Sequence, residues 1–325
     1  MTESAQPDGA HGAAPAAVAD APPPTPPTPP TPPPPPTPPI AVGWTDSSVL
    51  VAEHVMPLVA GGPSEGHWLL DLFSQLPISR QGAWLSLHCG SGGLEFLATQ
   101  RGLFASLDGF DPSPEAIAAA RAWVEFHGVG GVRFEVGVLP DLELPDNAYD
   151  LVLSQYSLHR LADPAGFFAR LDAALRPGGW LILNEYVGPK YFQYSARQLR
   201  IVEELLAILP PRLRVHWPTG GQKTMHIPPP VAHFLESAPL EAVSSDGIVR
   251  EVSQRFVLES RRDYGGSILN PLVAGIIGNF DPAREDDLAL LRMLAATERL
   301  LLREAALPSD FAVLVARKRP ADSAA

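Results

Sequence analysis

Short apolar runs alternate with stretches of helical periodicity through the middle of the chain. Apolar residues that recur every three or four positions predict helices at 92–100, 114–127 and 164–174. Short apolar runs bounded by turn residues predict five strands, at 83–87, 103–110, 132–136, 149–154 and 180–185. Strands separated by helices form βαβ units, so we predict a parallel sheet whose ligand-binding loops gather at one edge.

The flanking segments extend this pattern. Before the first strand we predict helices at 49–56 and 65–76, ended or kinked by Pro57 and ended by Pro77. After the fifth strand a helix at 197–209 leads into a long stretch rich in Pro and His, which we interpret as a lid or a substrate-binding insertion. Later elements are predicted at 255–259 (strand), 287–302 (helix) and 311–316 (strand). The fold class is therefore α/β, with a Rossmann-like, seven-stranded, mostly parallel sheet and helices on both faces.

The Ala- and Pro-rich N-terminus is expected to be a disordered tail. Residues 22–39 are only Pro and Thr, which cannot form a helix interior or a sheet ladder. We interpret this tract as a spacer, with a docking segment for a proline-binding partner as the alternative. The domain boundaries that we predict are a tail (1–41), a helical extension (42–82), the core (83–190), a helical lid insertion (191–250), the completion of the core (251–318) and a second tail (319–325).

Composition narrows the class of function. The formal net charge is -12 and Lys and Arg do not cluster, which argues against a nucleic-acid partner. The single cysteine, Cys89, fits a reducing compartment. The sequence has no apolar run long enough to span a membrane and no signal-peptide pattern, so we expect a cytoplasmic protein without a membrane partner. Its His residues lack the spacing of a metal site, and we expect no metal.

The turn after the first strand carries the first chemical signal. Gly90-Ser91-Gly92-Gly93 lies between a strand and a helix, where free amides face a ligand. Asp111 ends the second strand about 20 residues later, the spacing of a carboxylate that binds a ribose. The loop lacks both the third glycine of a dinucleotide site and the lysine of a Walker loop. A single nucleoside ligand therefore fits better than a nicotinamide cofactor.

With these motifs the chain resembles the class I S-adenosylmethionine-dependent methyltransferases. Its downstream part resembles a bacterial subgroup of these enzymes for which no substrate is firmly known. The motifs, in order, are Leu87-His88-Cys89-Gly90-Ser91-Gly92, Gly109-Phe110-Asp111-Pro112-Ser113-Pro114, Leu144-Pro145-Asp146-Asn147-Ala148-Tyr149-Asp150, Leu158-His159-Arg160-Leu161 and Leu175-Arg176-Pro177-Gly178-Gly179. The resemblance implies S-adenosylmethionine as cofactor. It implies cofactor contacts at Ser86, His88, Cys89, Gly90, Ser91, Gly92, Asp111, Pro112, Val138, Leu139, Ser154 and Gln155.

Three positions depart from the family pattern. The family usually has an acidic residue at Ser86, a glycine at His88 and often an aspartate at Val138. Each lost polar contact costs about 1 kcal/mol. These departures motivate an alternative function, a catalytically weakened or inactive methyltransferase fold that serves as a binding or regulatory module.

Candidate catalytic residues follow the fourth and fifth strands. His159 is a general-base candidate, with a packing role as the alternative, and Glu185 either orients an acceptor or pairs with Arg197 of the lid. Tyrosines of the downstream part that could line an acceptor pocket are Tyr186, Tyr191, Tyr194 and Tyr264, although an aromatic is more often core. The acidic charge and the lid favour a small-molecule or saccharide-type acceptor. The oligomeric state does not follow from the sequence.

Overall fold

The computed structural model describes residues 43–61 and 66–320, all within a compact unit that spans Ile40–Ala325. The predicted N-terminal tail, its docking segment, the first residue of the helix predicted at 65–76 and the last five residues of the second tail lie outside the described residues. The domain boundaries stay predictions. None of the described helices is long and apolar enough to cross a membrane.

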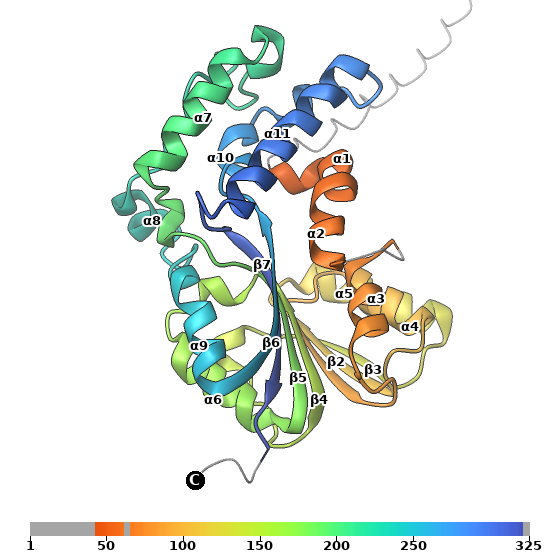
Figure 1. Ribbon diagram of the computed structural model, residues 1–325. Coiled ribbons are helices and arrows are strands. Elements are labelled where there is room, and N and C mark those ends of the chain that lie inside the picture. The colour runs from red at the N-terminus through yellow and green to blue at the C-terminus, as the bar shows by residue number, and fades with distance from the viewer. Residues whose placement is uncertain (1–42, 62–65, 321–325) are drawn as a thin grey trace, which may run out of the picture. The chain divides into compact units, whose positions relative to one another are not determined.

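One mixed sheet organises the described chain (Figure 1). Its strands lie in the order β3-β2-β1-β4-β5-β7-β6. The first five are parallel, and β7 is antiparallel to both β5 and β6. The strands are β1 Ala83–Leu87, β2 Ser106–Asp111, β3 Val132–Val136, β4 Tyr149–Gln155, β5 Leu175–Tyr186, β6 Phe256–Gly265 and β7 Phe311–Lys318. This is the seven-stranded, mostly parallel sheet that the pattern predicts.

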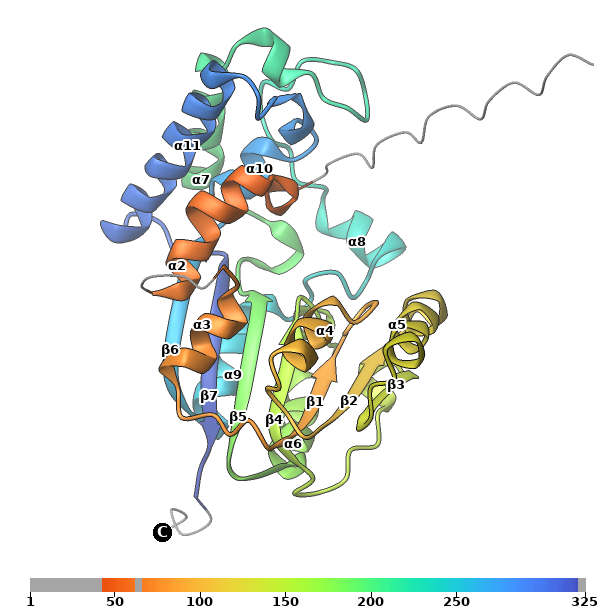
Figure 2. The same ribbon diagram turned by 90° about the vertical axis from the view of Figure 1, so that its right-hand side faces the viewer.

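Helices cover both faces of the sheet. Successive side chains of a strand point to opposite faces, and both sets are buried against helices. In β5, Ile182 packs into one apolar cluster, while Leu181 and Leu183 pack into the other. The first cluster includes residues of α3, α4 and α5, and the second includes residues of α6 and α9 (Figures 1 and 2). The helices are α1 Ser48–Leu50, α2 Met56–Ala60, α3 Trp68–Gln75, α4 Gly93–Gln100, α5 Pro114–His127, α6 Pro164–Ala174, α7 Ala196–Ile208, α8 Val231–Ser237, α9 Ile248–Arg255, α10 Leu269–Val273 and α11 Glu285–Arg303.

The first helical segment passes Pro57, so of the two predicted outcomes at this proline, an end or a kink, the end is wrong. A π-helical turn, Val51–Val55, joins α1 to α2, and the amide of Met56 donates to Val51. Proline lacks an amide hydrogen, and it falls beside a widened turn where the regular bonding ladder is already interrupted. The helix ends instead at Gly61, which has a φ of 65°.

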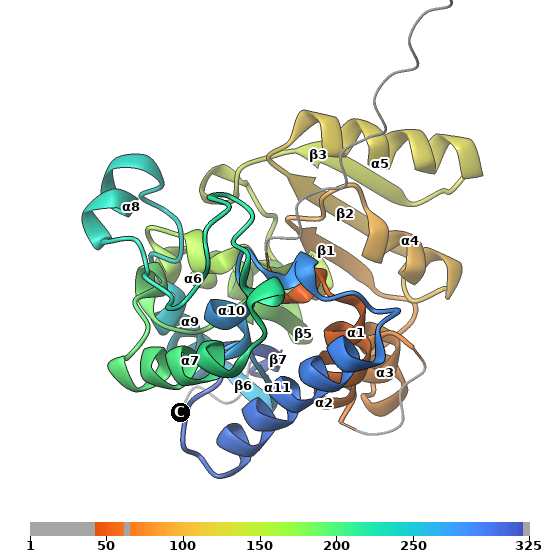
Figure 3. The same cartoon turned by 90° about the horizontal axis from the view of Figure 1, so that it is seen from above.

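A helical cap lies at the carboxyl edge of the parallel strands. Helices α7, α10 and α11 come from distant parts of the sequence and lie above β5, β6 and β7 in Figure 3. Ion pairs tie the cap together: Arg212 binds Asp287, and Arg292 binds Glu53 at 2.7 Å. The cap does not extend over β2 and β3 in the same view. The loops after β2 and β3 are therefore not covered by these helices.

Candidate active site

The turn between β1 and α4 is fastened to the end of β2 by one carboxylate. The amide of Gly90 donates to Asp111 Oδ2 at 2.9 Å, and the amide of Ser113 donates to Oδ1 at 2.9 Å. Asp111 is only 6% exposed. A carboxylate has about four lone-pair sites, so Asp111 keeps capacity to accept further hydrogen bonds.

Two glycines give this turn different properties. Gly92 has a φ of +83°, and a Cβ there would lie 2.7 Å from the Phe96 ring. Gly90 has a φ of +55°, and no atom lies within 4 Å of the position that its Cβ would take. Gly92 therefore packs the turn onto α4, whereas Gly90 presents bare backbone to open space. This is the geometry needed for a ligand to lie directly against the turn.

His88 occupies the turn in a conformation that favours glycine. Its φ is 60°, in the left-handed region, where a non-glycine residue costs about 1 to 3 kcal/mol. Burial lowers the pKa of its imidazole, although the charge of Asp111 opposes this shift. The histidine therefore keeps the glycine-like backbone of the turn at an energetic cost.

A carboxylate that the sequence analysis missed lies behind the turn. Ser86 of β1 donates its hydroxyl to Glu95 Oε1 of α4 at 2.5 Å, and both side chains are 2% exposed. Glu95 Oε2 has no hydrogen-bond partner among the described residues. Burial raises the pKa of Glu95 above its usual range. The acidic group absent at position 86 is thus present in space, contributed by the next helix. An acidic residue on the buried face of the short helix after the turn was the available signal.

The remaining predicted cofactor residues lie at the carboxyl ends of neighbouring strands. Ser154 is buried and its hydroxyl lies 2.5 Å from that of Ser157. Val138 is 51% exposed and Leu139 is buried. Cys89 is partly buried, and burial raises the pKa of its thiol above the ordinary range, which disfavours a nucleophilic thiolate. The other predicted contacts, with partial or full exposure, are Ser91, Pro112 and Gln155.

His159 and Glu185, predicted separately, form one buried cluster. Glu185 Oε2 accepts from His159 Nδ1 at 2.8 Å. Its Oε1 accepts from the amides of Ser157 and Leu158, at 2.7 and 2.8 Å. Glu185 is fully buried and His159 is 4% exposed. The glutamate therefore fixes both the turn that carries His159 and the orientation of its ring. It pairs with His159 and not with Arg197.

A second glutamate faces the other nitrogen of His159. Glu241, in the segment between α8 and α9, has Oε1 3.9 Å from His159 Nε2 and also pairs with Arg160. Burial alone would lower the pKa of His159, but the hydrogen bond with Glu185 and the nearby carboxylate of Glu241 raise it to about 9. His159 is thus an imidazolium at neutral pH while both carboxylates face it.

The predicted acceptor tyrosines take up different environments. Tyr186 is buried, with its hydroxyl donating to the carbonyl of Pro189 at 2.9 Å, and its ring centroid lies 6.0 Å from that of His159. Tyr264 is fully buried and donates to Asn184 at 2.6 Å. Tyr191 has a φ of 51° and packs on Phe234 of α8. A role for these residues in acceptor binding stays a prediction.

Comparison with known proteins places the middle of the chain in a family. A family model described as "Methyltransferase domain" matches residues 85–183. A Bordetella avium protein named ubiquinone biosynthesis O-methyltransferase is 28% identical over 172 residues, 51% of this chain and 66% of its own length. A Thermus thermophilus demethylmenaquinone methyltransferase is 32% identical over 105 residues, 32% of this chain and 47% of its own length. The chain thus spans less than two thirds of these relatives.

Solved structures with similar folds are more distant in sequence. An S-adenosylmethionine-dependent methyltransferase from Mesorhizobium loti is 20% identical, with a TM-score of 0.45, over 80% of this chain and all of that chain. A phosphoethanolamine N-methyltransferase 2 from Haemonchus contortus, solved with S-adenosyl-L-methionine, is 17% identical, with a TM-score of 0.49, over 82% of this chain and 56% of that chain.

Residues 85–183 are thus a methyltransferase domain on a Rossmann-like sheet. This domain, at residues 85–183, is of the S-adenosylmethionine-dependent methyltransferase type, and its cofactor is S-adenosylmethionine.

Proposed function

We propose that this protein transfers a methyl group from S-adenosylmethionine to a small-molecule or saccharide-type acceptor at the carboxyl edge of the sheet. The arrangement around Gly90 carries this proposal. The bare backbone of Gly90 faces open space, and Asp111 is held beside it with acceptor capacity to spare. Both features suit a nucleoside that lies against the turn.

Three residues would hold the cofactor. Asp111 would accept hydrogen bonds from the ribose hydroxyls, and the Gly90 region would lie under the methionine part. Glu95 would stabilise the ammonium group, because its unpartnered Oε2 is a buried acceptor behind the same turn. Bound there, the cofactor supplies an activated methyl group on a sulfonium, so the protein mainly positions the acceptor and excludes water.

His159 would remove the proton from the acceptor group. A general base must be neutral, and His159 is held as an imidazolium by Glu185 and Glu241. An acceptor that displaces Glu241 from Nε2 would lower the pKa of His159 and leave Glu185 to orient the ring. The acceptor would thereby create its own base as it binds.

Small-molecule acceptors are also favoured by the relatives. The Bordetella avium protein is named for ubiquinone biosynthesis, and an Arabidopsis thaliana relative is named phosphoethanolamine N-methyltransferase 3. These names differ in acceptor atom, oxygen in one and nitrogen in the other. The names therefore support a small acceptor but do not identify it.

Calorimetric titration of the full chain with S-adenosylhomocysteine tests the proposal. We expect saturable binding that Asp111→Ala weakens by about tenfold or more, because hydrogen bonds to a charged group are lost. Asp146→Ala, in the exposed turn before β4, is the control and should leave affinity unchanged. A wild-type chain that shows no binding at millimolar ligand contradicts the proposal. Equal affinity of wild type and Asp111→Ala contradicts the placement of the ribose.

The alternative, a weakened or inactive binding module, is favoured by one observation. His88 holds a backbone conformation that costs energy at the centre of the cofactor turn. A chain that binds S-adenosylhomocysteine but transfers no methyl group to quinol, amine or sugar acceptors would fit this alternative. Turnover with any of them excludes an inactive fold.

A further inference from the structure

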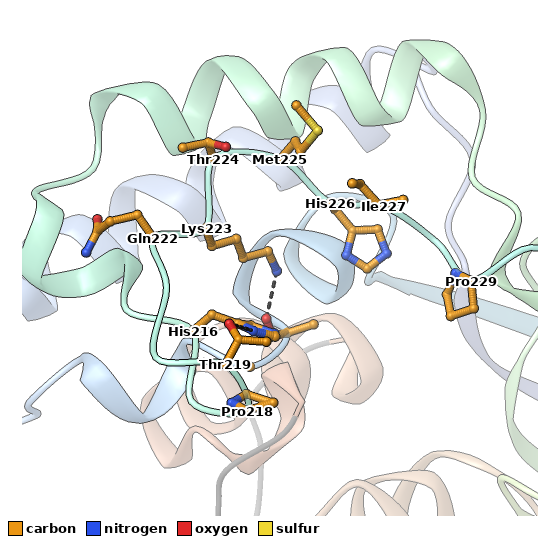
Figure 4. Close-up of a pocket in the computed structure, with 12 residues that line it drawn as sticks. His216, Pro218, Thr219, Gln222, Lys223, Thr224, Met225, His226, Ile227 and Pro229 are labelled. Atoms are coloured by element: carbon orange, nitrogen blue, oxygen red, sulfur yellow. Dashed lines mark hydrogen bonds between the residues drawn. The ribbon is translucent and has the colours of Figure 1, made fainter.

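A cavity inside the cap is separate from the cofactor turn. It has a volume of about 610 Å³ and lies between the segment 216–229 and the turn after α10, Ala274 and Gly275 (Figure 4). That volume is in the range of small-molecule sites, roughly 300 to 1,000 Å³.

The cavity wall is built into the backbone of the cap. Residues Val215 and Gln222 form an antiparallel bridge, and the amide of Trp217 donates to the carbonyl of Gly275 at 2.9 Å. Gly275 has a φ of +71°, and a Cβ there would lie 2.6 Å from the His216 ring. Only glycine therefore allows the turn to adopt this conformation and His216 to pack against it.

A buried lysine lies on the cavity wall without an anionic partner. Lys223 is 7% exposed, and its Nζ donates to the carbonyls of Pro271 and Ala274, both at 2.7 Å. Among the described residues, no carboxylate oxygen lies within 4.0 Å of the Lys223 ammonium group. Burial lowers the pKa of its ammonium group to about 8. A buried ammonium group that has no carboxylate partner is stabilised when a bound anion pairs with it.

The other polar groups of the wall also suit an anion. Figure 4 shows Lys223 directed toward the turn that holds His216 and Thr219, with His226 farther along the same segment. Burial, followed by the charges of Lys223 and His216, lowers the pKa of His226 to about 4, so it is a neutral imidazole at neutral pH. The residues that line the cavity include neither Asp nor Glu. Side chains that can donate hydrogen bonds, and a cation, thus face the cavity without a competing carboxylate.

We propose that this cavity is a binding site for a small organic anion, whose carboxylate or phosphate group pairs with Lys223. The apolar side chains of Met225 and Ile227 and the ring of Pro229 also line the cavity and suit the rest of an organic molecule. None of the residues that line this cavity belongs to the turn at 88–92 or to the cluster of His159 and Glu185.

The NMR signals of the lysine side chains in the full chain provide a direct test, because the sequence contains only Lys190, Lys223 and Lys318. Protein labelled with ¹³C at the lysine ε-carbon is titrated with inorganic phosphate and, separately, with benzoate, and Lys223 is assigned with Lys223→Arg. We expect a saturable shift of the Lys223 signal and a rise in its pKa with at least one probe. Benzoate as the tighter probe indicates a carboxylate ligand, and phosphate a phosphate ligand.

Variants add a second measurement. Lys223→Met should weaken calorimetric binding of the tighter probe by about tenfold or more. Lys190→Met is the matched control, because Lys190 is half exposed and pairs with Asp246 at 3.6 Å. The absence of a saturable Lys223 shift with both probes overturns the proposal, and so does equal affinity of wild type and Lys223→Met. If Lys223→Met does not fold, the wild-type titration still decides.

Discussion

Single residues show how the turn after β1 departs from the family pattern and still keeps its geometry. Ser86 takes the place of an acidic residue, yet the carboxylate of Glu95 hydrogen-bonds to it from α4. The strained His88 backbone keeps the shape that a glycine would adopt. An acidic group and the backbone geometry of the turn are therefore both preserved, by different residues from those of the family pattern.

Glu95→Gln should lower affinity for S-adenosylhomocysteine by about tenfold, because a neutral amide stabilises an ammonium group less than a carboxylate does. Affinity for 5′-methylthioadenosine, which lacks the amino-acid part, should not change. Titration calorimetry measures both. Ser86→Asp in the Glu95→Gln background should restore binding, and Glu125→Gln, exposed on α5, is the control. Equal losses for the two ligands would mean that Glu95 only supports the fold.

His159 should titrate with an apparent pKa near 9, measured from its imidazole carbon signal by NMR. Glu241→Gln should lower that pKa, because one of the two facing carboxylates becomes neutral. Since the folded-state pKa lies above the ordinary 6.5, His159 stabilises the fold below about pH 6.5, and this contribution is lost as pH rises through about 9. Glu236→Gln on the exposed side of α8 is the control. A His159 pKa at or below 6.5 would rule out this ion cluster.

At the scale of elements, local pattern predicted the sheet well where each element is bounded by its own turn residues. The bounds of β1, α5, β3 and α6 match the prediction, because capping residues and apolar alternation agree there. β6 was predicted as 255–259 but runs to Gly265. Its second half carries charged residues, and Arg262 donates to the carbonyls of Val59 and Ala60 at the end of α2. A polar strand residue bonded to a distant helix leaves no local signal.

The strand–turn–helix unit of β1 and α4 gives an element-scale prediction. Gly92→Ala should lower the free energy of unfolding by about 1 to 3 kcal/mol, since the new Cβ meets the Phe96 ring at a positive φ. Gly93→Ala is the matched control: no atom lies within 4 Å of its Cβ position, and alanine favours a helix start over glycine. Urea unfolding compares the two. A Gly92→Ala variant as stable as Gly93→Ala would contradict the packing described here.

At the scale of the whole described chain, the site depends on contacts between segments far apart in sequence. The cofactor turn and Asp111 could be predicted, because motif spacing and strand ends place them at one edge. The pairing of His159 with Glu185 and the approach of Glu241 could not, since these residues come from separate loops and strands. The cap also depends on contacts between distant segments, since Glu53 near the start of the described chain binds Arg292 of α11. Sequence spacing contains no information on such contacts.

A crystal structure of the full chain with S-adenosylhomocysteine tests the central claim, that the turn at Gly90 and Asp111 holds the cofactor for methyl transfer beside His159. We predict ribose hydroxyls within hydrogen-bonding distance of Asp111, the amino group on the Glu95 side of the turn, and the sulfur facing the edge that carries His159. A ligand bound elsewhere, or bound at this edge without a contact to Asp111, would contradict the claim.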